Sequence, residues 1–308
     1  MTNDSSEQHG DAGGPQDPLE HQDWSDAMGR RWLDHMAAFE GMLAPIGKAL
    51  VAHAKLMPGE TVVDVGCGGG PTTLALADAV TPGGFVLGLD VSPVLVDAAA
   101  RRATKGRRRP GSAQVRFVLG DAATAQPADA PFDVLFSRFG VMFFDDPYPA
   151  FANMRTWLKP GGRAVFSCWT PPTENPWMLE IQDIITRYVT PPEPTPNAPG
   201  PFALADPDRT RDILEKAGFA DVAIDVWRGE QALGGPGASP EAAADFATHG
   251  MHVGQMLEDE PEEVKAQARA DLVALFETHH RPEGVMLASS AWFVTARNPE
   301  PPETAADG

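Results

Sequence analysis

Residues 61–90 constrain the fold more than any other stretch of the 308-residue chain. Residues 61–65 are β-branched and apolar except for Asp64, a composition typical of a buried parallel strand. Three glycines then occupy alternate positions, Gly66, Gly68 and Gly70, and Pro71 is placed to begin a helix. A second apolar strand over residues 85–89 ends on an aspartate. This order of elements predicts an α/β sheet that binds a ligand over the glycine turn.

The spacing of the glycines narrows the class of ligand. A dinucleotide-binding turn has the pattern G-x-G-x-x-G, and here Pro71 stands in the place of the third glycine. The sequence also lacks the G-x-x-x-x-G-K-[ST] loop that binds nucleotide phosphates. The carboxylate of Asp90, at the end of the second strand, is placed to hold both hydroxyls of a ribose. We therefore expect a nucleoside ligand other than a dinucleotide.

Three motifs, in chain order, resemble those of the class I S-adenosylmethionine (SAM)-dependent methyltransferases. VVDVGCGGG resembles the first motif of that family, GLDVS its acidic-loop motif, and GDA at residues 120–122 its adenine-contacting motif. The resemblance implies SAM as cofactor and S-adenosyl-L-homocysteine (SAH) as product. It covers residues 61–168 well, the last two strands loosely and the insertions hardly at all. The cofactor-binding residues that it implies are Asp64, Gly66, Cys67, Gly68, Gly70, Thr73, Asp90, Val91, Ser92, Gly120, Asp121, Ala122 and Ser137.

Individual roles follow from the side chains at these positions. Asp121 can accept a hydrogen bond from the adenine amino group, and Ala122 offers its backbone amide. We expect Asp64 to hydrogen-bond backbone amides of the glycine loop while lying near the amino-acid end of the cofactor.

The remaining elements predict an α/β fold with a doubly wound, mostly parallel seven-stranded sheet and helices on both faces. The order that the resemblance implies is 3-2-1-4-5-7-6, with the seventh strand antiparallel. The predicted strands are residues 61–65, 85–89, 114–119, 132–137, 163–168, 219–227 and 291–297. A single methyltransferase domain is expected over residues 23–298, between disordered tails at 1–22 and 299–308. Its N-terminal helices, residues 23–57, are expected to break at Gly41 and Pro45, and helical lid insertions are expected at 170–201 and 228–284.

The C-terminal end of the fourth strand is the leading candidate for the reaction chamber, because ligands bind outside the carboxyl ends of such strands. The candidate substrate-binding residues are Arg138, Phe139, Met142 and Trp177. An alternative is that Arg138 caps a helix while Phe139 and Met142 are core residues. Large apolar side chains and methionines in the two insertions favour a small or medium hydrophobic acceptor, although the same side chains would also serve to bury the lids.

Methyl transfer from a sulfonium is an in-line displacement, so the protein mainly has to align and desolvate the reactants. An oxygen or carbon acceptor would also need a base. His249, His252 and Tyr188, all within the insertions, are the candidate catalytic residues, against the alternative that each is an ordinary surface or core residue. The histidine pairs have no nearby cysteine and no H-E-x-x-H pattern, so we expect no metal.

Net charge and cysteine content limit the partners and the cellular location that we expect. The net charge of −19, from 24 basic and 43 acidic residues, argues against nucleic acid and anionic lipid as partners. Two cysteines and no apolar run approaching ~20 residues indicate a cytoplasmic protein without membrane attachment. The expected partner is a small-molecule substrate, and a homodimer is a further expectation. A SAM- or SAH-binding protein, a relative that uses bound SAM electrostatically, and a nicotinamide dehydrogenase stay open as alternatives.

Overall fold

The structure is a computed structural model, and it describes residues 24, 27–105, 111–191, 193 and 195–301. The predicted N-terminal tail, residues 1–22, lies outside the described residues. So does the predicted C-terminal tail, except for residues 299–301, which have no regular secondary structure. The division into one domain with two tails stays a prediction.

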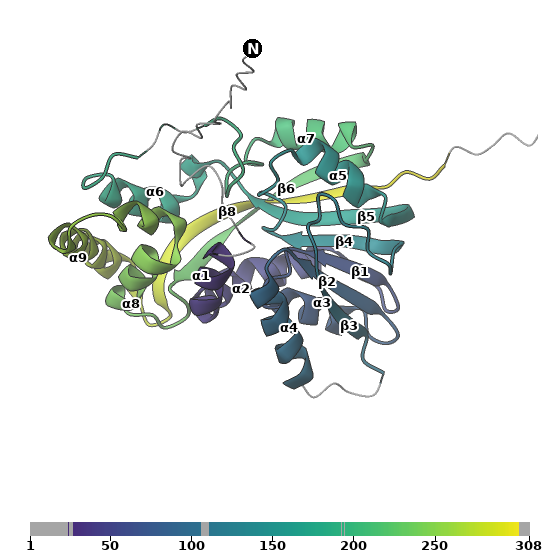
Figure 1. The fold of residues 1–308 in the computed structure, drawn as a ribbon, viewed down its shortest axis with the longest axis horizontal. Helices are drawn as coiled ribbons and strands as arrows, with labels where there is room; N and C mark the ends of the chain where they lie inside the picture. Colours follow the sequence, from purple (N-terminus) through teal and green to yellow (C-terminus); the bar gives the residue numbers. More distant parts are fainter. Residues whose placement is uncertain (1–23, 25–26, 106–110, 192, 194, 302–308) are drawn as a thin grey trace, which may run out of the picture.

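One mixed sheet forms the centre of the molecule (Figure 1). The order of its strands is β3-β2-β1-β4-β5-β8-β6, and a short strand β7 pairs only with β8. Strands β1 to β5 are parallel, whereas β8 runs antiparallel to both β5 and β6. The bounds are β1 Thr61–Val65, β2 Phe85–Asp90, β3 Gln114–Leu119, β4 Phe132–Arg138, β5 Leu158–Trp169, β6 Ala220–Leu233, β7 His280–Arg281 and β8 Gly284–Arg297. Since β8 corresponds to the seventh predicted strand, the predicted order and its antiparallel member are confirmed.

Burial explains why these segments are strands. β1 and β2 are covered on both faces, which accounts for their continuous apolar sequences. The edge strand β3 instead alternates between half-buried and exposed residues. Helices α2 (Met36–His53) and α3 (Pro71–Ala79) pack together on one side of the sheet, and α5 (Pro147–Arg155) and α7 (Pro207–Lys216) on the other (Figure 1). Helix α4 (Pro93–Lys105) packs on β2 and β3.

The N-terminal helices differ from the prediction. Helix α1 (Ala27–Asp34) ends before His35, and α2 continues without a break through Gly41 and Pro45. Burial of one face of α2, which includes Ile46, offsets the cost of about 3 kcal/mol that a proline imposes on a helix interior. Gly41 is a contact point, since a Cβ there would lie 2.5 Å from Cδ of Pro236.

The second insertion is shorter than predicted. Residues 228–233 belong to β6, which pairs with β8 from Arg228↔Ser290 to Leu233↔Val285, beyond the end of β5. The expectation that this stretch is helical was wrong. Helices of both insertions lie against one another and this two-stranded ribbon, away from β1–β3 (Figure 1). They are η1 Pro172–Glu174, α6 Pro176–Ile185, α8 Pro240–Asp245, the π-helix η2 Phe246–Gly250, η3 His252–Leu257 and α9 Glu262–His279.

Candidate functional site

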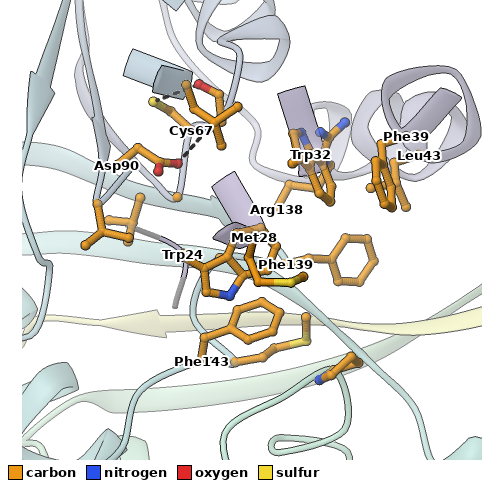
Figure 2. A pocket seen from close by; sticks show the side chains of 18 of the residues that line it. Trp24, Met28, Trp32, Phe39, Leu43, Cys67, Asp90, Arg138, Phe139 and Phe143 are labelled. Atoms are coloured by element: carbon orange, nitrogen blue, oxygen red, sulfur yellow. Dashed lines mark hydrogen bonds between the residues drawn. The ribbon is translucent and has the colours of Figure 1, made fainter. Parts of the chain in front are cut away.

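A cavity of about 420 Å³ lies at the carboxyl ends of the parallel strands (Figure 2). Its floor comes from the ends of β1, β2 and β4 and from the loop after β3. Its other walls come from α1, α2 and the two insertions. Cys67 and Asp90 lie at one side of the hollow in Figure 2, and Phe139 and Phe143 at another. The cavity therefore joins the predicted cofactor motifs to the predicted reaction chamber.

In the glycine loop, residues 66–70, main-chain atoms without side chains line the cavity. Gly66 has φ 67°, and a Cβ on it would lie 2.7 Å from Cα of Gly140, in the turn after β4. Gly68 has φ 53°, and a Cβ there would face open space, with Nε1 of Trp32 nearest at 3.8 Å. The first glycine thus allows two turns to touch, and the second leaves room for a ligand beside the main chain.

Asp90 is held in place by the loop. One carboxylate oxygen accepts a hydrogen bond from the Gly68 amide at 2.7 Å, and the other from the Ser92 amide at 2.9 Å. Burial raises the pKa of Asp90 above its ordinary value, against the opposing effect of these amides. A carboxylate has about four lone-pair sites, so acceptor capacity remains for ligand hydroxyls.

Four further predicted cofactor residues line the cavity beside Asp90. Gly120, Asp121 and Ala122 come from the loop after β3, and Val91 is 39% exposed. Asp121 accepts a hydrogen bond from the Ala123 amide at 2.8 Å and is otherwise exposed. An apolar surface next to a free carboxylate edge suits a flat, polar-edged ring.

The structure places five of the predicted cofactor residues behind the wall of the cavity: Asp64, Gly70, Thr73, Ser92 and Ser137. Asp64 accepts a hydrogen bond from the Thr73 hydroxyl at 2.7 Å, so its partner is a side chain and not the predicted backbone amides. Burial raises the pKa of Asp64 to about 7. Ser137 donates to the Val65 carbonyl at 2.8 Å and ties β4 to β1. These residues shape the loops that reach the ligand.

All four predicted substrate residues line the cavity: Arg138, Phe139, Met142 and Trp177. Phe139 has φ 62°, a conformation rare for a large side chain, and its ring stacks on Trp169 with centroids 4.1 Å apart. Trp169 in turn contacts Trp177 at 5.1 Å. Arg138 ends a strand and caps no described helix, so the first part of the alternative is wrong. Its second part is confirmed, because Phe139 and Met142 are both buried in the hydrophobic core.

The three predicted catalytic residues are separated. His252 lines the cavity, whereas His249 and Tyr188 do not. Nδ1 of His249 lies 2.9 Å from the Asp245 carbonyl oxygen, and the Tyr188 hydroxyl donates to Asp271 at 3.0 Å. Geometry therefore favours His252 among the three.

The segment before β1 supplies lining residues that the motifs do not mark. They are Trp24, which precedes α1, and Met28, Trp32, Phe39, Glu40, Met42 and Leu43 of α1 and α2. Trp32 and Phe39 are stacked with centroids 4.0 Å apart. The signal for them is the spacing of large apolar residues by three or four, which indicates a helix face but not what covers it.

Within the described part of the chain, no three His, Cys, Asp or Glu side chains are grouped as metal ligands. In the same part, no helix has the length and apolar character needed to cross a membrane.

Comparison with known proteins agrees with this geometry. Residues 62–162 match the family model described as a methyltransferase domain. Phosphoethanolamine N-methyltransferase 1 of Triticum aestivum is 38% identical over 130 residues, which are 42% of this chain and 25% of that protein. Nocamycin O-methyltransferase of Saccharothrix syringae is 30% identical over 187 residues, 58% of this chain and 65% of that protein. The chain thus spans between a quarter and just under two thirds of these relatives.

A solved structure has a similar fold. The Haemonchus contortus phosphoethanolamine N-methyltransferase 2, in complex with phosphomonomethylethanolamine and SAH, superposes with a TM-score of 0.54 at 16% identity. The match covers 91% of this chain and 61% of that one. The matched domain, the order of the strands and the glycine loop beside Asp90 together support a class I SAM-dependent methyltransferase.

Proposed function

We propose that this protein transfers the methyl group of SAM to a small, largely apolar acceptor. The observation that carries the proposal is that one cavity contains both the family's cofactor motifs and an aromatic chamber built by the ends of β4 and β5 together with the first insertion. The relatives named above, which methylate nitrogen or oxygen according to their names, support the reaction class.

The residues of the cavity fit SAM. Asp90 keeps acceptor capacity for the ribose hydroxyls, Gly68 leaves its main chain open, and Val91 with Asp121 suits an adenine ring. When bound, SAM supplies a methyl group on a positively charged sulfur. Asp64 and Ser137 act from behind the wall by holding the loops in position.

The chain's own contribution is alignment and exclusion of water. Phe139, Trp169 and Trp177 form a contiguous aromatic wall in the cavity. Such a wall restricts an acceptor to a few orientations, and proximity and orientation alone can supply about 7–11 kcal/mol. His252 is the group in the lining best suited to take a proton from an acceptor hydroxyl, because an imidazole titrates near neutral pH.

The lining also limits the acceptor. Methionines from several segments, Met28, Met42, Met142, Met178 and Met251, line the cavity among the aromatic rings. Flexible thioethers fill irregular gaps around an apolar ligand. A hydrophobic metabolite with one reactive polar atom is therefore the acceptor class that we propose.

The test is incubation of the protein with methyl-labelled SAM and a metabolite extract, followed by mass spectrometry of labelled products. Transfer of label to a small apolar compound is the expected result. SAM binding in calorimetry without any transfer would instead indicate a binding protein or a non-methylating relative. Binding of NADH in a fluorescence titration, with no SAM binding, would indicate a dehydrogenase.

We also propose a cytoplasmic location, which the two buried free cysteines, Cys67 and Cys168, support because a reducing compartment keeps thiols unpaired. A homodimer stays a proposal that size-exclusion chromatography with light scattering tests directly.

A further inference from the structure

Arg138 is a charged side chain in the cavity wall without a protein counter-ion. It is the last residue of β4 and lines the cavity. Its Nε atom is buried and has no hydrogen-bond acceptor, and among the described residues no carboxylate lies within ion-pair distance of its guanidinium. A guanidinium stays protonated in proteins, and a buried charge is costly without a partner. A ligand is the natural source of that partner.

The two carboxylates that act electrostatically on Arg138 are Glu40 and Asp64. Both have other partners. Glu40 pairs with Arg102 through two hydrogen bonds, of 2.7 and 2.8 Å, and Asp64 accepts from the Thr73 hydroxyl. Both carboxylates favour the charged guanidinium from a distance, but neither forms an ion pair or a hydrogen bond with it.

The fold also makes room for this guanidinium. Gly47 lies inside α2, where glycine is unfavourable. A Cβ at Gly47 would lie 3.2 Å from Nη1 and 3.3 Å from Cδ of Arg138. The glycine thus forms a notch in which the arginine side chain lies.

The order of the strands shows which part of a ligand would meet Arg138. Asp121 follows β3, Asp90 ends β2, the glycine loop follows β1, and Arg138 ends β4. A nucleoside held by Asp90 and Asp121 leaves the rest of its molecule to run past the glycine loop toward β4. The contact between Gly66 and Gly140 shows that the loop and the turn after β4 are adjacent.

We propose that Arg138 binds a carboxylate group of the ligand, a proposal that rests on the proposed function. The order of the strands favours the amino-acid end of SAM as the source, and a carboxylate on the acceptor is the other source. In the described lining, Arg138 is the sole arginine or lysine, which suits the single charge of a carboxylate better than a phosphate dianion. Two parallel N–H groups of a guanidinium also match the two oxygens of a carboxylate in geometry.

The test is calorimetry with two ligands that differ in one group, SAH and its decarboxylated counterpart S-adenosyl-3-thiopropylamine. For the wild-type protein we expect loss of the carboxylate to weaken binding about 10- to 100-fold, the usual effect of a charge-assisted hydrogen bond. Arg138→Gln should bind both ligands with similar, weak affinity. Arg187→Gln, which removes an exposed arginine that contacts Asp271, is the matched control and should behave as wild type.

A second arm distinguishes the source of the carboxylate. Benzoate and the neutral benzamide are titrated into protein saturated with SAH. If SAH binding does not depend on Arg138 but a preference for benzoate is lost in Arg138→Gln, the acceptor supplies the carboxylate. If neither arm depends on Arg138, the proposal is overturned. Failure of the wild-type protein to bind SAH at all would instead refute the proposed function, and this inference with it.

Thermal unfolding of the ligand-free protein separates this role from a structural one. Removing a buried charge without a counter-ion should leave the melting temperature of Arg138→Gln unchanged or raised. A structural role predicts a lower melting temperature. Gly47→Ala gives a second test that keeps the charge, because its methyl group would lie 3.2 Å from Nη1 and press the guanidinium out of its present position. It should weaken SAH binding in the same direction but less.

Discussion

The protonation of Asp64 gives a prediction that is independent of the acceptor. This carboxyl is 1% exposed, lies under the glycine loop and has the Thr73 hydroxyl as its hydrogen-bond partner. Burial raises its pKa from 3.8 to about 7, although the Thr73 hydrogen bond and the charge of Arg138 act in the opposite direction. In the unfolded chain the pKa returns to the ordinary value, so folding and proton binding are linked at this residue.

The sign and size of the effect follow from that linkage. Because the folded pKa is the higher one, the native state holds the proton more tightly, and stability falls as the pH rises from 3.8 through about 7. A slope of ~1.36 kcal/mol per pH unit gives about 4 kcal/mol over the whole interval, of which about 3 kcal/mol is lost above pH 5.

The change to make is Asp64→Asn, which keeps an oxygen to accept the Thr73 hydrogen bond and removes the ionisation. Urea unfolding of both proteins without ligand is measured from pH 5 to 8.5, and the difference in unfolding free energy is plotted against pH. Other groups titrate in both proteins and cancel. The wild-type protein should lose about 3 kcal/mol relative to the variant, or about 1 M in urea midpoint if m is ~3 kcal/mol/M. A flat difference curve, or one that rises with pH, would refute the reasoning.

Three further predictions concern the loops and the chamber. Asp90→Asn should weaken SAH binding about 10- to 100-fold in calorimetry through loss of charge-assisted hydrogen bonds to the ribose; unchanged affinity would show that Asp90 does not bind it. Gly66→Ala should destabilise the protein by about 1–3 kcal/mol in urea unfolding, because the new Cβ meets Gly140, whereas Gly59→Ala, also at positive φ but in open space, should cost less; equal losses would contradict the close approach. His252→Asn should lower transfer of labelled methyl to an O–H acceptor by about 10²–10⁴-fold with unchanged SAH affinity, and full transfer would exclude it as the base.

The strands of the cofactor half were predictable because their signals are local. β1 and β3 have the predicted bounds, and β2 and β4 differ by one residue. In each case an apolar run ends at a turn residue, so sequence neighbours alone define the element. The glycine loop was predictable for the same reason, since Gly66 and Gly68 adopt the positive φ values that favour glycine.

Elements whose stability comes from distant contacts were not predictable. Residues 228–233 contain Arg228, Gly229 and Glu230, which weaken a strand prediction, yet pairing with β8 holds them extended. The arginine forms an ion pair with Glu174, and the glutamate pairs with Arg281. These contacts join segments more than fifty residues apart, and no local pattern indicates them.

In the site too, residues with local sequence signals were predictable and features that depend on distant contacts were not. Asp90 and Asp121 were found from motifs because the sheet fixes them a few residues from a strand end. Arg138 was placed correctly in the chamber, but the notch at Gly47 that accommodates it comes from a helix ninety-one residues earlier in the sequence. Which of the three catalytic candidates faces the cavity depended on how the two insertions fold, since Tyr188 lies in the first and both histidines in the second.

The pairing of Leu233 with Val285 gives the second insertion a particular kind of attachment. All of its helices lie between Leu233 and Val285, which are paired residues on adjacent antiparallel strands. The whole insertion is therefore the loop of one β-hairpin. For a flexible loop, closure entropy grows by only about 0.6 kcal/mol for each doubling of its length. The tip of this hairpin is therefore a natural grafting point, where one helical insertion can be exchanged for another of different size while the cofactor half stays unchanged.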